Sequence, residues 1–224
     1  DLQTPITRVQ LFADLLKRAI DGESNRYIQK IHAASERMSS MVASLQDLAQ
    51  VRSGQLVLDT QPTDVADVVA SACRAAEPDA ADRTLETDLP AAPVRAEVDP
   101  DAFRRIVENL IGNALKYTAP GDHIAVSVRG PGTALPEPSD GVPDAADGSS
   151  SAVRIAVEDT GPGIGDGALD TLFEPFTRGD TDGDGMGLGL AVSKDLAQAM
   201  GGDLRVASEV GQGTRFVVHV PATD

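Results

Sequence analysis

The sequence predicts an α+β chain in which an N-terminal antiparallel helical hairpin precedes an α/β sandwich. Over residues 2–48, apolar side chains recur three and four positions apart, which is the spacing of amphipathic helices. After residue 53 this period is lost, and short strand-like runs alternate with helical patterns and glycine-rich turns. The chain has 224 residues, 41% of them hydrophobic, which is enough to bury a core. We therefore expect two domains, at residues 1–53 and 54–224.

Composition and charge exclude several classes of function. The formal net charge of -16 would repel the phosphates of DNA or RNA, so we expect no nucleic acid partner. A phosphate ligand would have to be held by a metal ion and by backbone N–H groups. No run approaches the roughly 18–20 apolar residues that span a bilayer, so we expect membrane attachment only through parts outside this chain. The chain begins at Asp1 inside a periodic pattern, as a fragment of a longer protein would.

The hairpin is expected to consist of two helices. The first covers residues 2–20 and the second residues 27–48, with Asp21-Gly22 between them. Each helix carries one apolar seam, and the seam stays exposed to water unless another hairpin covers it. We therefore predict a homodimer in which two hairpins form a four-helix bundle. The alternative is that the hairpin packs on the rest of its own chain.

The second domain is expected to contain alternating helices and strands. Helices are predicted at residues 64–76, 100–117 and 188–200. Strands are predicted at residues 55–58, 84–88, 94–97, 124–128, 153–158, 204–208 and 214–220. Asp64 and Asp99 are suitable N-caps, Pro100 fits a first helical turn, and Gly201-Gly202 ends the last helix. Residues 130–151, rich in Pro, Gly, Ser and Asp, are predicted to be a mobile surface loop without an assigned role.

One face of the helix over residues 100–117 is polar. Asn109, Asn113 and Lys116 share this face, because they are four and three residues apart. Amide oxygens can coordinate Mg²⁺, an ammonium group can approach phosphate, and the ring of Tyr117 can lie against a base. Taken alone, the pattern could equally be a solvated helix face.

Two glycine-rich stretches follow. The sequence Asp-Thr-Gly-Pro-Gly-Ile at residues 159–164 comes directly after an apolar strand, so the Asp159 carboxylate can accept a hydrogen bond from an exocyclic amine. The sequence Gly-Asp-Gly-Met-Gly-Leu-Gly-Leu at residues 183–190 opens the last helix, whose free N–H groups attract anions. Alone, the first stretch could be a turn and the second is a weak signal. The second is not a dinucleotide fingerprint, because no ordered βαβ unit surrounds it.

Together and in this order, these three pieces resemble the N, G1 and G2 boxes of the Bergerat-type ATPases. The sequence Leu-Phe-Glu-Pro-Phe at residues 172–176 stands where histidine kinases have their F box. The sequence Asp-Leu-Gln-Thr-Pro-Ile-Thr at residues 1–7 is similar to their H box, His-(Glu/Asp)-Leu-Arg-Thr-Pro-Leu, with Gln3 in place of the commoner Arg. Over essentially its whole length, the chain thus resembles the catalytic half of bacterial sensor histidine kinases of two-component systems. This implies a Bergerat ATP-binding fold for the second domain.

The resemblance assigns roles around Mg²⁺ and ATP, the expected cofactors. Asn113 would hold Mg²⁺ with help from Asn109, Lys116 would meet the phosphates, and Asp159 would read the adenine amine. Arg178 would steady the γ-phosphate, or could equally be a surface residue. The residues placed around the nucleotide are Asn109, Asn113, Lys116, Tyr117, Asp159, Gly161, Gly163, Ile164, Phe176, Arg178, Gly185, Met186, Gly187, Leu188, Gly189 and Thr214.

The resemblance also implies a phosphoacceptor histidine immediately before Asp1, outside this sequence. Asp1 would orient that imidazole, and Thr4 would orient a water in a phosphatase reaction. The three histidines of the sequence, at positions 32, 123 and 219, are expected to be structural or solvated. The implied activity is autophosphorylation, followed by transfer to an aspartate of a response-regulator receiver domain docked near residues 7–16. The chain would be the cytoplasmic portion of a sensor anchored in the bacterial inner membrane.

Two other functions share parts of this pattern. A mechanical ATPase of the gyrase, chaperone or mismatch-repair kind has the same pocket, but usually carries a glutamate where Asn109 stands, and an amide is a poor base. The hairpin ahead of the pocket also favours a kinase. A pseudokinase that only binds partners would not need Asn113, Asp159 or the glycines before the last helix.

Overall fold

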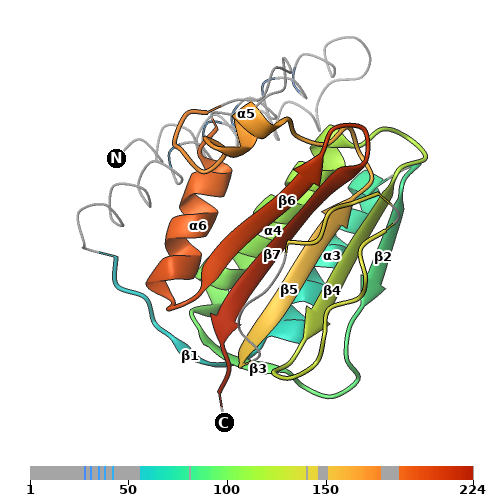
Figure 1. The fold of residues 1–224 in the computed structure, drawn as a ribbon. Helices are drawn as coiled ribbons and strands as arrows, with labels where there is room; N and C mark the ends of the chain where they lie inside the picture. The colour runs from blue at the N-terminus through green and yellow to red at the C-terminus, as the bar shows by residue number, and fades with distance from the viewer. Residues whose placement is uncertain are drawn as a thin grey trace. The chain divides into compact units, whose positions relative to one another are not determined.

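Figure 1 shows the computed structural model of the chain. The chain divides into two compact units, Asp1–Leu56 and Val57–Asp224. The structure describes residues 56–80, 82–139, 141–145, 151–177 and 187–223, together with Ile28, Ile31, Ser35, Met38 and Val42. In the described part of the chain, no helix combines the length and the apolar character needed to cross a bilayer.

In the first unit, the described residues Ile28, Ile31, Ser35, Met38 and Val42 are all helical and lie within the second predicted helix of the hairpin, whereas Leu56 has no regular structure. Ile28 is buried, whereas Ile31 and Met38 are 50% and 54% exposed. These two exposed side chains are seven residues apart and belong to the predicted apolar seam. The first predicted helix, and with it Asp1 and Thr4, lies outside the described residues.

The second unit is built around a five-stranded sheet with the order β2-β4-β5-β7-β6 (Figure 1). The strands are β2 (Thr84–Asp88), β4 (His123–Arg129), β5 (Ala152–Asp159), β6 (Asp203–Glu209) and β7 (Gly213–Pro221). β2 and β4 are parallel, and the other neighbouring pairs are antiparallel. The pairing of β5 with β7 places Asp159 opposite Thr214. The predictions of these five strands are confirmed to within one residue at each end.

Three helices cover one face of the sheet (Figure 1). They are α3 (Val65–Ala80), α4 (Pro100–Tyr117) and α6 (Gly189–Ala199). Alternate strand residues such as Ile124 and Ile155 are fully buried, because a strand directs every second side chain to the same face. α4 packs against both other helices. Its predicted start is confirmed: Asp99 Oδ1 accepts hydrogen bonds from the amides of Asp101 and Ala102, at 3.1 and 3.0 Å.

A second, two-stranded sheet corrects one prediction. β1 (Gln61–Asp64) pairs with β3 (Arg95–Val98) in antiparallel fashion. The strand predicted at residues 55–58 is wrong, since the described residues 56–60 have no regular structure. Val57 is 92% exposed, so its apolar side chain has no face against which to pack. Pairing with β3, rather than local composition, decides where this strand forms.

Two helical features also depart from the prediction. α3 continues past Pro78 to Ala80, beyond the predicted end at residue 76. A short helix, α5 (Asp166–Leu169), was not predicted and contains no buried residue. Ala80, at the added end of α3, is buried, and both features leave the predicted order of the other elements unchanged.

Residues 130–151 form the connection between β4 and β5. Their described residues contain no helix or strand, as predicted. However, the expectation of a surface loop is wrong for part of the segment, because Val142 and Ala145 are both buried, each only 6% exposed. Ala145 packs with Ala156 and Val217 of β5 and β7. The segment therefore lies against the sheet and buries side chains of its own there.

Candidate functional site

The polar face of α4 begins at Asn109, which lies against α6. The Asn109 amide donates a hydrogen bond of 2.9 Å from Nδ2 to Ser193 Oγ. A β-carbon at Gly189, the first residue of α6, would overlap with Asn109 Oδ1. With glycine at this position, the Asn109 side chain can lie directly against the start of α6; a larger residue would have to displace that side chain. Asn109 and the glycine-rich start of α6, which are far apart in the sequence, thus lie next to each other.

The rest of the polar face becomes more exposed toward the end of α4. Asn113 is half-buried, whereas Lys116 and Tyr117 are exposed. Lys116 Nζ lies 3.2 Å from Tyr117 Oη and 4.8 Å from the centre of its ring. The helix ends at Thr118, whose amide donates to the Ala114 carbonyl oxygen at 3.1 Å. A cation and an aromatic ring are thus presented together at the carboxyl end of this helix.

Asp159 stands at the end of β5, where it is 6% exposed. Its Oδ1 accepts a hydrogen bond of 3.0 Å from the amide of Gly161. Burial raises the pKa of Asp159 to about 6, and the charges of Asp122 and Glu158 add to this effect, while the Gly161 hydrogen bond opposes it. A β-carbon at Gly161 would lie 3.4 Å from the Tyr117 carbonyl oxygen, so this turn abuts the end of α4.

The other predicted residues of this turn are tied to the end of the sheet. Gly163 has a φ of +69°, and a β-carbon there would overlap with the Glu209 carbonyl oxygen, so this position requires glycine. The amide of Ile164 donates a 2.8 Å hydrogen bond to Ser208 Oγ. Ser208 Oγ in turn lies 2.8 Å from Thr214 Oγ1. Ile164 and Thr214 are therefore joined through one hydroxyl group.

Ser208 is a site residue that the sequence reasoning missed. It pairs with Thr214 across β6 and β7. Because directly paired residues point to the same face of a sheet, a correct register would have revealed it. The sequence contains no local signal that marks Ser208 as a site residue, because serines also occur in strands that are far from any site.

The F box and the glycine-rich stretch meet at their backbones. The amide of Phe176 donates to the carbonyl oxygen of Gly187 at 2.9 Å, and Phe176 has a φ of 68° with a side chain that is 60% exposed. Leu188 is only 3% exposed, so its side chain belongs to the core and only its backbone is available to a ligand. Arg178, Gly185 and Met186 lie outside the described residues.

Taken together, these contacts make α4 a common wall. Its middle touches the first turn of α6 at Asn109, and its end touches the turn after β5 at Gly161. Among the residues that the structure describes, no group of three or more His, Cys, Asp and Glu side chains could hold a metal ion. A divalent ion at this wall would therefore depend on amide oxygens and on the ligand's own phosphates.

Two family models match the chain. The model described as "Histidine kinase-, DNA gyrase B-, and HSP90-like ATPase" matches residues 98–224. The model described as "His Kinase A (phospho-acceptor) domain" matches residues 1–54. The first match covers more than half of the chain and includes the whole of the wall described above.

Curated relatives and solved structures cover nearly all of the chain. The alginate biosynthesis sensor protein KinB of Pseudomonas aeruginosa is 30% identical over 99% of this chain and 35% of its own length. The aerobic respiration control sensor protein ArcB of Escherichia coli is 30% identical over 99% of this chain and 28% of its own length. Full-length ShkA in complex with AMPPNP matches with a TM-score of 0.75 and 26% identity, over 99% of this chain and 44% of ShkA. The chain thus spans well under half of each.

Proposed function

Because the chain belongs to the sensor histidine kinases, we propose that it is the catalytic core of such a kinase, which binds Mg-ATP and phosphorylates a histidine. The observation that carries the proposal is the common wall formed by α4. Asn109 and Ser193 are 84 positions apart in the sequence, yet they share a hydrogen bond. Together with the contact of Gly161 with the end of α4, this bond supports one ligand site formed by the polar helix face, the turn after Asp159 and the start of α6.

The base would be read by Asp159. Its carboxylate is buried and has accepting capacity beyond the bond from Gly161, so it can receive the exocyclic amine of adenine. Guanine has a carbonyl oxygen in place of that amine. This oxygen and the Asp159 carboxylate are both acceptors, so a buried contact between them would have no hydrogen bond and would be unfavourable. Gly163, Ile164 and Thr214 surround the same turn. We therefore expect ATP to be preferred over GTP.

The phosphates would lie toward the start of α6, which supplies free backbone N–H groups after Gly187. Asn113, with Asn109, would hold Mg²⁺ through amide oxygens, and Lys116 would contribute a positive charge. Such oxygens are the hard ligands that Mg²⁺ prefers. When bound, Mg²⁺ neutralises the charge that phosphoryl transfer develops on the phosphates. The net charge of -16 makes this neutralisation more important here than in a basic protein.

The transfer step needs a nucleophile in line with the γ-phosphate. A neutral imidazole nitrogen of the histidine expected before Asp1 forms a bond to the γ-phosphorus, the bond to the bridging oxygen breaks, and ADP leaves. Asp1 would accept the N–H of the other ring nitrogen and so fix the tautomer. The phosphoryl group would then pass to an aspartate carboxylate of a receiver domain. Thr4 would orient a water that hydrolyses the aspartyl phosphate.

Two further parts of the proposal concern assembly. The exposed Ile31 and Met38 support a homodimer through the hairpin, because they lie on the predicted seam and remain open to solvent in the single chain. A response-regulator receiver domain would dock on the same hairpin near residues 7–16. The complete protein would be held at the inner membrane by parts outside this chain, with the present chain on the cytoplasmic side.

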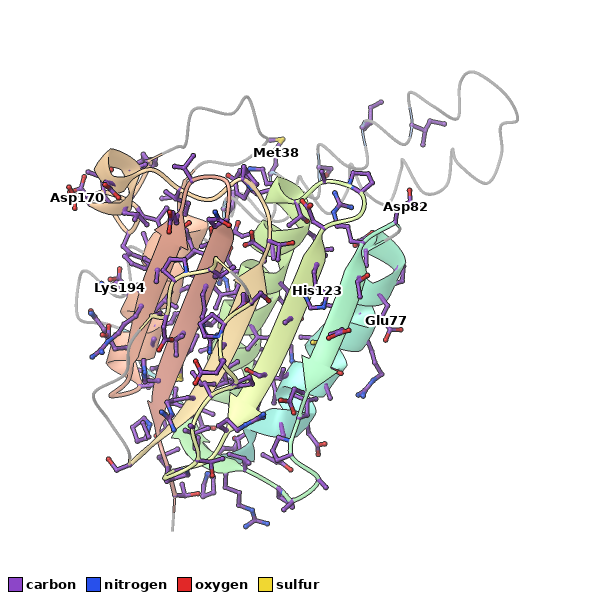
Figure 2. All side chains as sticks on the ribbon, turned by 45° about the vertical axis from the view of Figure 1, so that its right-hand side comes forward. Met38, Glu77, Asp82, His123, Asp170 and Lys194 are labelled. Carbon is purple, nitrogen blue, oxygen red and sulfur yellow. The ribbon has the colours of Figure 1, made fainter. Side chains whose placement is uncertain are left out.

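Equilibrium titration with labelled ATP, with and without Mg²⁺, tests the nucleotide part of the proposal. We expect Mg²⁺ to strengthen binding. Asp159→Asn should weaken it by about tenfold or more, because an amide oxygen is a weaker acceptor than a carboxylate and the amide N–H₂ group cannot accept a hydrogen bond from the adenine amine. The matched control is Asp170→Asn, the same change at an exposed carboxylate next to α5 (Figure 2), which should leave binding unchanged.

An assay of ATP hydrolysis, run beside this titration, separates the alternatives. Sustained ATP hydrolysis without a histidine acceptor would indicate a mechanical ATPase of the gyrase or chaperone kind. We expect little hydrolysis, because Asn109 cannot act as a general base. Binding that is weak and independent of Mg²⁺ would indicate a pseudokinase and would contradict the proposal.

A further inference from the structure

Two charged side chains are buried directly behind the residues proposed to read the base. Glu158 and Arg215 are 5% and 2% exposed, and they are paired across β5 and β7. The next pair along the two strands is Asp159 with Thr214. Because successive strand residues point to opposite faces, Glu158 and Arg215 lie on the face without helices, and Asp159 and Thr214 lie on the helix face.

Each charged side chain also holds the segment of residues 130–151. Arg215 donates from Nη1 to Glu158 Oε2 and from Nη2 to the Pro136 carbonyl oxygen, both at 2.8 Å. The amide of Ser139 donates to Glu158 Oε1 at 2.9 Å. We call Glu158, Arg215, Pro136 and Ser139 the latch. It connects two strands and the segment above them through three hydrogen bonds that involve a charged group, which are the stronger kind.

The latch also forms part of a cavity between the segment and the sheet. This cavity has a volume of about 240 Å³, and Glu86, His123, Ser127, Glu158 and Arg215 are among its lining residues. Figure 2 shows His123 on β4 at this face of the sheet, and its Nε2 lies 3.2 Å from Glu86 Oε2. The histidine is thus engaged with a different acid, and Arg215 is the cation that meets Glu158.

The position of the latch in the sheet is important. β5 ends at Asp159 and β7 begins at Gly213, so the pair of Asp159 with Thr214 lies at the end of the ladder. Strand ends open more easily than strand centres, because they have fewer neighbours to hold them. The ion pair of Glu158 with Arg215 lies one residue before the end of the ladder. It therefore restrains Asp159 and Thr214, which have the fewest strand hydrogen bonds around them.

From this geometry we propose that Arg215, through its ion pair with Glu158, is a positioning residue for the nucleotide site. It holds the last pair of β5 and β7, Asp159 and Thr214, in the arrangement that receives the base. This role rests on the proposed ATP binding. It also gives a function to residues 130–151, because that segment supplies two of the four latch residues and keeps Glu158 and Arg215 away from water.

Electrostatics supports the same role. The charges that act on Asp159 are those of Glu158 on its own strand and Asp122 on the turn before β4. Arg215 on β7 pairs with Glu158, and its Nε lies 3.8 Å from Asp144 Oδ1 in the covering segment. Glu158 and Asp122 both raise the pKa of Asp159, so they oppose the ionised form that accepts a hydrogen bond from adenine. Arg215 offsets the charge of Glu158. Loss of Arg215 would leave a buried carboxylate unpaired, next to the residue that must carry a negative charge.

The test compares ATP and GTP binding in the full chain for three variants and one control, by competition with labelled ATP in the presence of Mg²⁺. Arg215→Met removes the latch cation, Arg215→Lys keeps its charge without the two-pronged geometry, and Glu158→Gln removes the neighbouring charge. Arg205→Met is the control, since Arg205 lies on the adjacent strand β6 and is 46% exposed beside Asp203. Thermal unfolding of each variant is followed in parallel.

For Arg215→Met we expect ATP affinity to fall about tenfold at pH 7.5 and the preference for ATP over GTP to shrink by a similar factor. Arg215→Lys should lie between this variant and the unaltered chain, and Arg205→Met should equal the unaltered chain. In Glu158→Gln, the pH at which ATP binding is half lost should move downward from about 6. A purely structural role would lower the unfolding temperature without changing the base preference or this midpoint.

A folded Arg215→Met variant with unchanged base preference would overturn the proposal. If that variant does not fold, Arg215→Lys decides: a reduced preference for ATP over GTP supports the role, because lysine cannot make both hydrogen bonds of Arg215, and an unchanged preference overturns it. Failure of the unaltered chain to bind ATP at all would contradict the proposed function instead, so the two failures are distinguishable.

Discussion

The two faces of the sheet are covered in different ways. On one face, α3, α4 and α6 bury large apolar side chains such as Phe103 and Leu110, both with no exposed area. On the other face, an irregular segment covers small apolar residues, a charged pair and a cavity that this pair helps to line. The helix face carries the candidate nucleotide site at its edge. From this difference we infer that the helices supply most of the stability. The irregular segment instead helps to position Asp159 and Thr214 through the latch.

The largest expected effect tests the first half of this comparison. Phe103→Ala on α4 should lower the free energy of unfolding by about 3–5 kcal/mol, because it leaves a cavity in a core that cannot collapse around it. Val142→Ala in the irregular segment should cost only about 1 kcal/mol, since it removes far fewer contacts. Denaturant unfolding measures both. Equal losses of unfolding free energy in the two variants would contradict the view that the helix face supplies most of the stability.

The second prediction concerns the cost of the buried carboxylate at the site. Asp159→Asn should raise the free energy of unfolding at pH 7.5 by up to about 3 kcal/mol, because the folded protein no longer has to bury an ionised group. The same variant should bind ATP less well. Chemical denaturation beside the ATP titration shows whether stability and function are opposed at this residue; a less stable variant would contradict this interpretation.

A third prediction follows from the pH dependence of the same group. The pKa of Asp159 is about 6 in the folded chain against 3.8 as its ordinary value, so its stabilising effect is complete below pH 3.8 and is lost as the pH rises to about 6. ATP binding should show the opposite trend and weaken as the pH falls through about 6. Titrations between pH 5 and 8 measure this, with Asp159→Asn as the control that should lack this step.

The smallest expected effect is at Ser208, where the sheet meets the turn after β5. Ser208→Ala removes the acceptor for the Ile164 amide and the partner of Thr214, so we expect a loss of about 1 kcal/mol in unfolding free energy. A several-fold weaker ATP affinity should accompany it. Ser71→Ala, at an exposed position of α3, provides the comparison and should leave ATP affinity unchanged and alter the unfolding free energy by no more than about 0.5 kcal/mol.

Much of the second unit could be predicted from the sequence, for identifiable reasons. Strong caps such as Asp99 with Pro100 and the alternating apolar residues of the five strands are local signals, and they located these elements closely. The expectation that Asn109 and the glycine-rich start of α6 gather around one nucleotide came from the family resemblance; their direct contact is seen only in the structure. Whether Asn109 and Asn113 hold Mg²⁺ stays a prediction.

The remaining features depend on contacts that no local pattern encodes. β1 forms at Gln61–Asp64 because β3 lies opposite, and the partnership of Ser208 with Thr214 depends on strand register. The composition of residues 130–151 indicates a loop, but it contains no sign that the loop would cover Glu158 and Arg215. Long-range pairing of this kind becomes visible only once the sheet is assembled.

The central claim, that α4 brings the turn after β5 and the start of α6 to one nucleotide, can be measured directly by NMR. Mg-ATP is titrated into the ¹⁵N-labelled chain while the amide signals of Gly161 and Gly189 are followed. We predict that both signals shift and that both yield the same dissociation constant. A shift at only one of them, or two different constants, would contradict the claim.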